Sequence, residues 1–453
     1  MKSKIDKKNL LFSNKALIAL LIPIVIEQLL NSFMGMIDTM MVSNVGSEAL
    51  SGVSLVDSVN NLIVQLFSAM ATGAAIICSH YIGMKDEKGA NKAARQVVLS
   101  VTVIALVITV LGLAFKRPLL GVIFGKVDEG VMDNALRYFL YTALSYPFLA
   151  LFSAGSAIFR SCGNSRYPMT VSVISNVINI IGNYILIFVC GMGVSGAAIS
   201  TLVSRVICMV AVFIALAKPK QAIVVNDYIS IRPEWGLISS ILAIGIPSGI
   251  ENSMFQFGKL AIQSTVSTMG TAAIAAQAMT NILENVNGIF GIGVGMCLMT
   301  VVGQCMGAGR KEEAKYYIVK LCGIAEVGIL VSCLLVYAFT KPVTILAGME
   351  SESAALCIEM VAAITIAKPL VWVGSFVPAY GLRAAGDVKF SMITSIITMW
   401  GCRVALCIFL VKAFGMGPMA VWYGMFADWT LRSIIFISRY LSGAWLKKEV
   451  IKA

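Results

Sequence analysis

The sequence predicts an all-α polytopic membrane protein with twelve transmembrane helices in two parallel-repeat six-helix bundles, and three observations lead to this fold class. Hydrophobic residues make up 58% of the 453 residues and charged residues only 13%, which lies outside the range of soluble globular proteins. The apolar runs exceed about 20 residues and do not alternate with period two, which favours helices over a β-barrel. The chain also repeats itself with a shift of about 224 residues.

About twelve apolar runs are long enough, at a rise of 1.5 Å per residue, to cross a hydrocarbon core of roughly 30 Å. They cover residues 16–42, 52–79, 94–115, 138–159, 167–189, 194–217, 236–267, 274–305, 316–339, 354–382, 390–411 and 418–438. The longest inner connection separates the first six runs from the last six. We therefore expect an N-terminal six-helix lobe at residues 1–217, a cytoplasmic connection at 218–235 and a C-terminal six-helix lobe at 236–453.

The repeat rests on rare residues rather than on apolar ones. Pro23 matches Pro247 and Glu27 matches Glu251 at the same shift, and GMG at Gly191 is repeated later as GMG at Gly415. An even number of spans in each half means that both halves run in the same direction across the membrane. This predicts a parallel repeat about an axis along the membrane normal, with cargo held in a central cleft between the lobes.

The basic residues predict the topology. With the Lys-rich N-terminus placed inside, about 24 Lys and Arg fall in inner segments, about 6 in outer segments and about 5 within spans. Inner connections such as Met84–Arg95 and Gly309–Lys315 carry this charge, whereas the outer connection Cys190–Ser195 carries none. The net charge of +12 is therefore a topology signal and does not indicate a nucleic-acid partner. We expect both termini in the cytoplasm and no cleaved signal peptide.

The composition also argues against catalytic and metal chemistry. The chain has one His, and its 11 Cys form no pair at metal-ligand spacing, which disfavours zinc and haem sites. Most Cys lie inside apolar runs, where they act as small hydrophobic side chains, so we expect no disulfide framework. We expect no cofactor and no enzyme activity; an intramembrane enzyme remains a distant alternative, because it would need a nucleophile with a base or a metal pair.

The first span carries an unusual polar stripe. Glu27, Asn31, Met34 and Asp38 lie within about 60° of one another around a helix. A carboxylate inside the bilayer costs roughly 2.5 to 3.5 kcal/mol and normally faces the bundle interior or a watery cavity. This helix is therefore predicted to form one wall of a transport pathway.

Several motifs resemble those of the multidrug and toxic compound extrusion (MATE) family. They are a Pro followed fifteen residues later by the Asp of IDTMMVSNVG, the RSCGN motif at Arg160–Asn164, NYILIF at Asn183–Phe188, and GMGVSGAAIST at Gly191–Thr201. The resemblance implies a secondary antiporter that expels organic, often cationic, compounds against an inward flow of Na⁺ or H⁺ by alternating access. It also implies a monomer in the plasma (inner) membrane, with small organic substrates, a monovalent cation and the lipid bilayer as partners.

The resemblance implies an ion-coupling site in the N-terminal lobe. Asp38 holds the place of the family's first-helix Asp, and Thr201 matches a family Thr near the same site. Asn179 and Asn183 share one stripe of the fifth span, and many prokaryotic members have Asp at the position of Asn183. An amide oxygen there can still bind Na⁺, so Na⁺ at Asp38, Asn179 and Asn183 is one hypothesis. Hydrogen bonds between helices are the alternative role of the two Asn.

Glu27 and Glu251 are further candidates for ion coupling. The missing N–H of the preceding Pro frees a carbonyl, which makes a cation site beside it plausible. In the family, the corresponding seventh-helix Glu lies eight residues after the Pro, where this chain has Phe255, so Glu251 departs from the pattern by one helical turn. The alternative for both residues is a buried carboxylic acid that is hydrogen-bonded to its neighbours.

Polar, aromatic and sulfur-containing side chains on the predicted cleft helices are candidates for substrate contact. These are Asn31, Met34, Asn61, Phe255, Lys259, Glu284 and Asn285. The polar clusters on the second and eighth spans could instead bind the two lobes together, and Lys259 could neutralise Glu251 or Glu284 in a structural ion pair. We expect Asp428 and Arg432 to form a pair at i,i+4 spacing.

Arg160 and Arg383 occupy equivalent places in the two repeats, each before a Gly at an inner helix end. Topology and helix termination account for them, so we assign them no transport chemistry.

A flippase for a lipid-linked glycan is the alternative transport function, because the wider superfamily contains such proteins. A polyphosphate cargo would need several Lys and Arg in the cleft. Five basic residues lie within spans, alongside more numerous acidic and amide groups: Arg205, Lys259, Lys368, Arg403 and Arg432. This balance favours the multidrug exporter, and the doubled lobe plan favours alternating access over a fixed channel.

Overall fold

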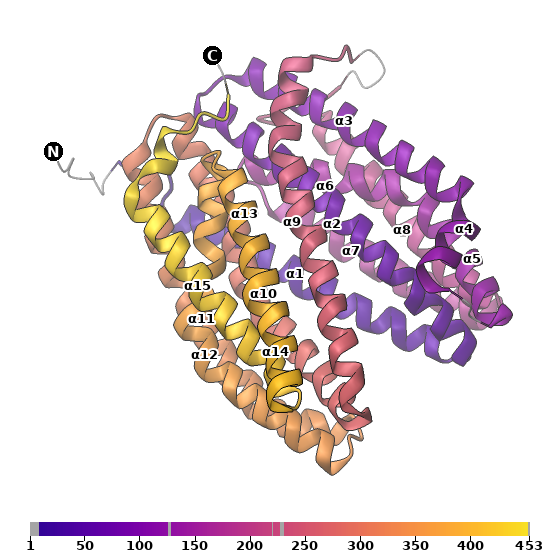
Figure 1. Cartoon of the computed structure of the whole chain (residues 1–453). Coiled ribbons are helices and arrows are strands. Elements are labelled where there is room, and N and C mark those ends of the chain that lie inside the picture. Colours follow the sequence, from indigo (N-terminus) through magenta and orange to yellow (C-terminus); the bar gives the residue numbers. More distant parts are fainter. Residues whose placement is uncertain (1–8, 126–127, 220, 227–230, 452–453) are drawn as a thin grey trace. The chain divides into compact units, whose positions relative to one another are not determined.

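The computed structural model describes residues 9–125, 128–219, 221–226 and 231–451, and regular structure in this part of the chain is helical (Figure 1). Among these residues, nine helices are long and apolar enough to cross a membrane, and the bent pair α5 and α6 makes a tenth. Helices α9 and α15 occupy the two remaining predicted spans. Most of the Lys-rich N-terminus that was expected inside, residues 1–8, lies outside the described residues.

The first half of the chain forms the helices of six predicted spans and one short additional helix. They are α1 (Asn14–Ser43), α2 (Ser47–Gly83), α3 (Glu87–Ala114), α4 (Lys116–Phe124), α5 (Glu129–Leu144), α6 (Tyr146–Ser161), α7 (Arg166–Asn183) continued by the π-helical turn η1 (Tyr184–Val189), and α8 (Gly193–Leu216). Helices α5 and α6 form one span that bends by 43° at Ser145. Helix α2 packs against both, and α8 packs against α5, α6 and α7.

The second half repeats this order. Its elements are α9 (Trp235–Val266), the 3₁₀ turn η2 (Ser267–Met269), α10 (Thr271–Gly307), α11 (Lys311–Leu346), α12 (Ser351–Ala384), α13 (Val388–Thr398), the π-helical turn η3 (Met399–Val404), α14 (Ala405–Phe414), α15 (Met419–Ser442) and the 3₁₀ turn η4 (Ala444–Lys447). Helix α12 packs against α10, α11 and α15, and α15 also packs against η3 and α14.

The chain divides into two compact units. The N-terminal unit is Ile18–Gly249, and the C-terminal unit is Ile250–Ala453 together with the segment that ends at Leu17. The division falls inside α9, whose first part contacts α2: a Cβ added at Gly73 would lie 2.9 Å from the carbonyl oxygen of Ile241. The predicted lobe boundary at residues 218–235 describes the sequence repeat and stays a prediction.

Large aromatic side chains of α12 pack directly against glycines of α10. A Cβ at Gly291 would lie 2.3 Å from the ring of Trp372, and a Cβ at Gly295 would lie 2.4 Å from the ring of Tyr380. Only a residue without a side chain permits this approach, so the Gly-rich run on α10 serves helix packing.

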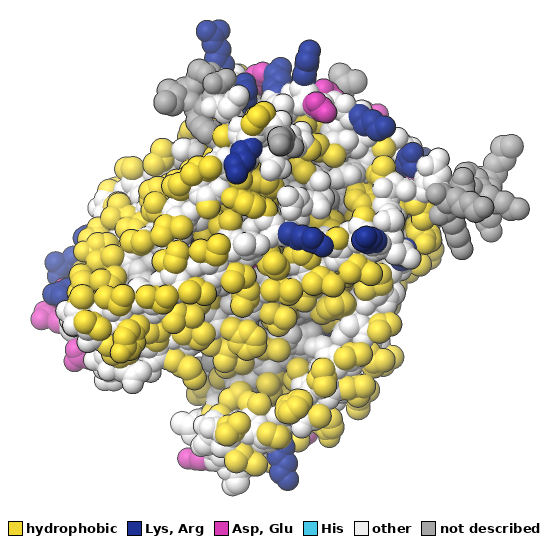
Figure 2. Space-filling model, turned by 180° about the vertical axis from the view of Figure 1, so that it is seen from behind, with side chains coloured by type: hydrophobic (Ala, Val, Ile, Leu, Met, Phe, Trp, Pro, Cys, Tyr) yellow, Lys and Arg dark blue, Asp and Glu magenta, His cyan; other side chains and the backbone are white. Residues whose placement is uncertain are grey.

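The composition of the surface suits contact with the hydrocarbon core of a lipid bilayer. Apolar side chains cover most of the face drawn in Figure 2, and charged side chains are sparse there.

In the C-terminal unit, the segment before α1 is fixed to the start of α11, where Tyr317 Oη donates to the Phe12 carbonyl oxygen (2.8 Å) and accepts from the Phe12 N–H (2.9 Å). The hydroxyl of Tyr440, near the end of α15, donates to the carbonyl oxygen of Lys315 (3.2 Å). The segment before α1 and the end of α15 thus lie beside the basic connection between α10 and α11.

Candidate functional site

The N-terminal unit brings Asp38, Asn179, Asn183 and Thr201 together from α1, α7 and α8. Asn183 Nδ2 donates to Asp38 Oδ1 at 2.7 Å. In the amide orientation that satisfies its neighbours, Asn179 donates to Asp38 Oδ1 (2.9 Å) and accepts from the hydroxyl and the backbone N–H of Thr201 (3.3 and 3.2 Å). Four of the five residues that were predicted for ion coupling in this lobe are therefore neighbours, and the fifth, Glu27, pairs with Arg160.

One oxygen of this cluster has no partner. Asn183 is buried, and its Oδ1 makes no hydrogen bond among the described residues. Unpaired buried acceptors are rare, because they lose their hydrogen bonds to water and gain none in exchange. Together with the oxygens of Asp38, Asn179 and Thr201, it makes an oxygen-rich donor set of the kind that hard cations prefer.

The helix geometry around Asn183 is also unusual. Helix α7 ends at this residue and continues as the π-helical turn η1, and the fifth span of the other half carries the π-helical turn η3. π-Helical turns change the register of the backbone hydrogen bonds and are frequent at functional sites. Asn183 directly precedes η1, and Arg403 lies within η3.

A second polar network adjoins the Asp38 cluster. Tyr146 Oη donates to Asn60 Oδ1 (2.7 Å), and Asn60 Nδ2 donates to Asp57 Oδ1 (3.2 Å). Arg205 donates to Ser145 Oγ (2.6 Å), and its charge acts on both Asp57 and Asp38. Asp57 is thus a second membrane carboxylate held by an amide, and it was not among the predicted ion-coupling residues.

The predicted substrate contacts of this unit differ in exposure. Asn31 is exposed and accepts a hydrogen bond from Ser172 Oγ (3.3 Å), and Asn61 on α2 is exposed. Met34 is buried at 9% exposure.

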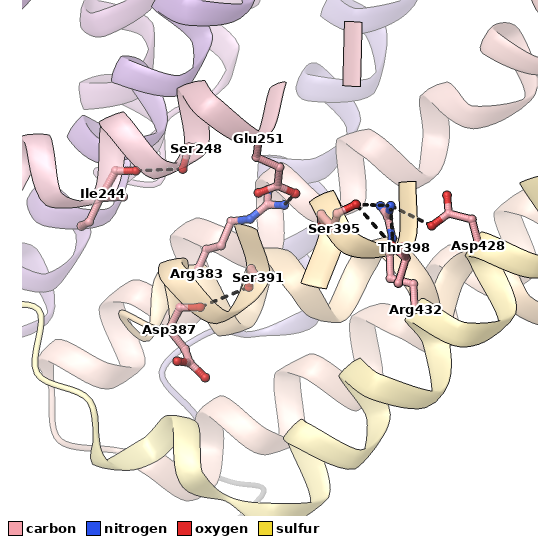
Figure 3. Close-up of polar contacts among 10 residues, drawn as sticks. All are labelled: Ile244, Ser248, Glu251, Arg383, Asp387, Ser391, Ser395, Thr398, Asp428 and Arg432. Carbon is pink, nitrogen blue, oxygen red and sulfur yellow. Dashed lines mark hydrogen bonds and ion pairs between the residues drawn. The ribbon is translucent and has the colours of Figure 1, made fainter. Parts of the chain in front are cut away.

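Glu27 and Glu251 each meet an arginine at the equivalent place of their repeat. Arg160 Nη1 lies 3.1 Å from Glu27 Oε2, and Arg383 Nη2 lies 2.6 Å from Glu251 Oε1 (Figure 3). Both carboxylates are buried, at 4% and 3% exposure. Each ion pair ties the helix that contains the Pro to the end of the fourth span, so both carboxylates have a cation as partner.

The C-terminal unit contains two further ion-pair groups. Lys368 Nζ donates to Glu284 Oε1 at 2.7 Å, and the Lys368 side chain is fully buried. Asp428 binds two arginines, with Arg403 Nη2 at 2.5 Å and Arg432 Nη2 at 2.9 Å. The expected i,i+4 pair of Asp428 and Arg432 is present, and Figure 3 shows Arg432 also reaching Thr398.

The other predicted contacts of this unit surround these groups. The ring of Phe255 lies 4.8 Å from the guanidinium carbon of Arg432. Lys259 is exposed and makes no hydrogen bond or ion pair among the described residues, and Asn285 is exposed. Glu251 and Glu284 are paired with Arg383 and Lys368 and not with Lys259.

Among the described residues, no three His, Cys, Asp or Glu side chains lie close enough together to hold a metal ion. A cation at Asp38 would therefore depend on amide and hydroxyl oxygens.

The comparison with known proteins identifies the family. The sequence profile of the MatE family matches residues 23–185 and 247–409, one stretch in each half of the chain. This chain belongs to the MATE family. The two stretches begin at Pro23 and Pro247, which is the shift that the sequence repeat predicts.

Two relatives cover the MATE chain almost end to end. The transporter YisQ of Bacillus subtilis (strain 168), described as uncharacterized, is 28% identical over 460 residues, which cover 99% of this chain and 97% of YisQ. The probable multidrug resistance protein NorM of Thermotoga maritima is 26% identical over 470 residues, with the same two coverages. The chain is thus similar to multidrug transporters, and MATE transporters are not enzymes and need no cofactor.

Solved structures confirm the fold. A crystal structure of a MATE protein in complex with MaL6 superimposes with a TM-score of 0.89 at 21% identity, covering 96% of this chain and 97% of that one. The predicted class, twelve transmembrane helices in two repeats within a multi-pass membrane protein, is therefore correct.

Sequence reasoning did not pair four cations of this MATE transporter with their carboxylates. Arg160 and Arg383 were assigned to topology and helix termination alone, and Gly163 and Gly386 after them do adopt the left-handed conformation, with φ of 80° and 96°. The ion pairs could have been found, because Glu27 precedes Arg160 by nearly the same number of residues as Glu251 precedes Arg383. No such match exists for Lys368 and Arg403. The pairs of Glu284 with Lys368 and of Asp428 with Arg403 have no equivalent pair in the first half of the chain.

Proposed function

We propose that this MATE protein is a secondary active exporter that carries organic, often cationic, compounds outward against an inward flow of Na⁺ or H⁺ by alternating access. The observation that supports ion coupling at Asp38 is that no cation of the described residues lies at hydrogen-bond distance from its carboxylate. Glu27, Glu251, Glu284 and Asp428 each form an ion pair, whereas Asp38 is held by the amides of Asn183 and Asn179.

A carboxylate in this setting favours uptake of a cation. A charged carboxylate without a counter-charge is costly inside a bilayer, so Asp38 gains by binding either Na⁺ or a proton. The unpaired Asn183 Oδ1 and the Thr201 hydroxyl supply further oxygens for Na⁺. An ion and a cationic substrate would then exclude each other, because each favours a different conformational state.

The remaining predicted residues take two further roles in this proposal. Glu27 and Glu251 could bind a coupling cation only after the ion pair with Arg160 or Arg383 has broken. We therefore propose that these two carboxylates take part in the conformational change of the transport cycle. Substrate contact is proposed for the side chains that were predicted to line the cleft: Asn31, Met34, Asn61, Phe255, Lys259, Glu284 and Asn285.

We also propose that the exporter acts as a monomer in the plasma (inner) membrane, with both termini in the cytoplasm. Leu11, before α1, and Tyr440, near the end of α15, lie beside the basic connection Gly309–Lys315, and basic connections stay on the cytoplasmic side.

Transport in proteoliposomes tests the ion site. We expect Asp38→Asn to abolish export of a cationic dye driven by an imposed Na⁺ or pH gradient, while the protein elutes as a folded monomer. Asp133→Asn is the matched control, because Asp133 is 60% exposed and pairs only with Arg137 on the surface of α5. Undiminished gradient-driven export by Asp38→Asn would overturn the assignment, and the gradient that drives the wild type identifies the ion.

A further inference from the structure

The middle of the C-terminal unit carries more positive than negative charge. Six ionisable side chains act on one another there: the cations Lys259, Lys368, Arg403 and Arg432, and the carboxylates Glu284 and Asp428. Four cations and two carboxylates leave a net charge of +2. The neighbouring pair of Glu251 and Arg383 is neutral and does not change this balance, and counting Glu326 of α11 would still leave +1.

Both carboxylates of this group already form ion pairs with cations other than Lys259. Asp428 is shared by Arg403 and Arg432, and Glu284 binds Lys368. Arg432 also donates to Thr398 Oγ1 (3.2 Å) and to the Ser395 carbonyl oxygen (3.3 Å), so its Nε and Nη2 donors are occupied.

Arg403 and Lys259 keep free donors. Arg403 is buried at 4% exposure, and its Nε has no hydrogen-bond partner among the described residues. Lys259 is exposed and lies one helical turn after Phe255 on α9, and the Phe255 ring is 5.6 Å from the guanidinium carbon of Arg403. A buried guanidinium with an unused donor and an ammonium nearby is an arrangement that an oxyanion would complete.

Aromatic rings stabilise the charges of the buried arginines and of Lys368, but in the described part of the chain they do not contact Lys259. The guanidinium carbons of Arg432 and Arg403 lie 4.8 and 5.6 Å from the centre of the Phe255 ring, and Lys368 Nζ lies 5.1 Å from the Trp372 ring. Cation–π contact stabilises such charges. Lys259 has no such ring contact among the described residues, so packing alone does not account for its charge.

The N-terminal unit shows the opposite balance. Asp38 and Asp57 share the charge of one cation, Arg205, and the pair of Glu27 and Arg160 is neutral. The sign of the charge therefore separates the two units, with a cation-attracting group of residues in one and an anion-attracting group in the other.

We infer that the C-terminal unit binds the oxyanion of an organic substrate, a carboxylate or a phosphate, through Lys259 and Arg403. Asp428 and Arg432 are positioning residues that hold Arg403 in place. This inference rests on the proposed export function and adds a substrate class to it: compounds that carry an acidic group, with or without a cationic group.

A pair of dyes isolates the acidic group. A rhodamine with a free carboxylic acid and its methyl ester share the same cationic ring system and differ by one negative charge. We expect purified wild-type protein in detergent to bind the acid about tenfold more tightly than the ester in a fluorescence anisotropy titration, the factor that one charge-assisted contact of about 1.4 kcal/mol supplies.

Lys259→Gln is the decisive variant, because Lys259 is exposed and forms no ion pair with a described residue. We expect it to remove the preference for the acid, and Lys259→Glu to reverse that preference. Lys412→Gln, an exposed lysine near the end of α14, is the matched control and should behave as wild type. Equal affinity of wild-type protein for acid and ester, or a preference that survives Lys259→Glu, would overturn the inference.

Transport separates this inference from the export function on which it rests. Gradient-driven export of the ester dye by wild-type protein tests the export function alone, and the ratio of acid to ester export tests the oxyanion site. A fluorescent phosphatidic acid in the same vesicles distinguishes the source of the oxyanion. Its translocation in preference to the rhodamine acid would indicate a lipid phosphate, and translocation of the rhodamine acid alone would indicate a soluble organic acid.

Discussion

At the scale of single residues, the partner of each membrane carboxylate decides what that carboxylate can do. A carboxylate bound to an arginine has its charge balanced and gains little from a further cation. Asp38 is bound by neutral amides and keeps its charge available. The neighbour of Asp38 at hydrogen-bond distance is the amide of Asn183 and not a second carboxylate, and this favours coordination by amide oxygen.

Asn183→Asp tests this reading. The new carboxylate would lie within hydrogen-bond distance of Asp38, and two carboxylates so close cannot both be ionised, so one of them must hold a proton. We expect dye export from proteoliposomes to depend several-fold more strongly on an imposed pH gradient than in the wild type. Asn44→Asp at the exposed end of α1 is the control and should leave the dependence unchanged. An identical response of Asn183→Asp and wild type would contradict the expectation.

At the scale of helices, each of the repeated Pro helices forms one ion pair, and a hydroxyl donates to a carbonyl oxygen three residues before the Pro. In α1, Pro23 cannot donate to the carbonyl of Ala19, and Ser165 Oγ lies 3.5 Å from that oxygen and 2.6 Å from the carbonyl oxygen of Leu20. In α9, Ser248 Oγ donates to the carbonyl oxygen of Ile244 at 2.9 Å (Figure 3). The Pro supplies a weak point in the helix, and the ion pair limits how far the helix moves there.

The pair of Glu251 and Arg383 predicts a stability pattern. Glu251→Gln leaves the Arg383 guanidinium largely buried without its counter-charge, and removing one partner of a buried pair costs about 3–5 kcal/mol. We expect a clear fall in the midpoint of thermal unfolding in detergent. The double variant Glu251→Gln with Arg383→Gln removes both charges and should recover most of that loss. A double variant no more stable than the single one would show that the pair contributes through packing and not through charge.

At the scale of the whole molecule, one sequence plan is used twice with different charges. Both halves begin with a Pro helix, pair a Glu with an Arg, and carry a π-helical turn in the fifth span. The first half places carboxylates near its polar centre and the second half places cations there. Two similar scaffolds can therefore bind ligands of opposite charge.

The topology can be read from the native cysteines. We expect a membrane-impermeant maleimide to label Cys190, which is exposed in the outer connection, on intact cells, and Cys190→Ser to lose this label. In the Cys190→Ser background, Lys88→Cys in the connection Met84–Arg95 should be labelled only in inverted vesicles, because basic connections remain in the cytoplasm. Labelling of Lys88→Cys on intact cells would reverse the predicted orientation.

The sequence alone determined the class, the order of the spans and the repeat, and its resemblance to the MATE family implied the cluster of Asp38, Asn179, Asn183 and Thr201. These depend on hydropathy, on helical periodicity and on motifs, which are properties of neighbouring residues along the chain. Only the tertiary structure decided which charges meet. Glu251 meets Arg383 across 132 positions and Asp428 meets Arg403 across 25, and helix packing, which local sequence does not encode, sets those distances. Among the residues that the structure describes, the same packing leaves Asp38 without an arginine at hydrogen-bond distance and Lys259 without a carboxylate partner.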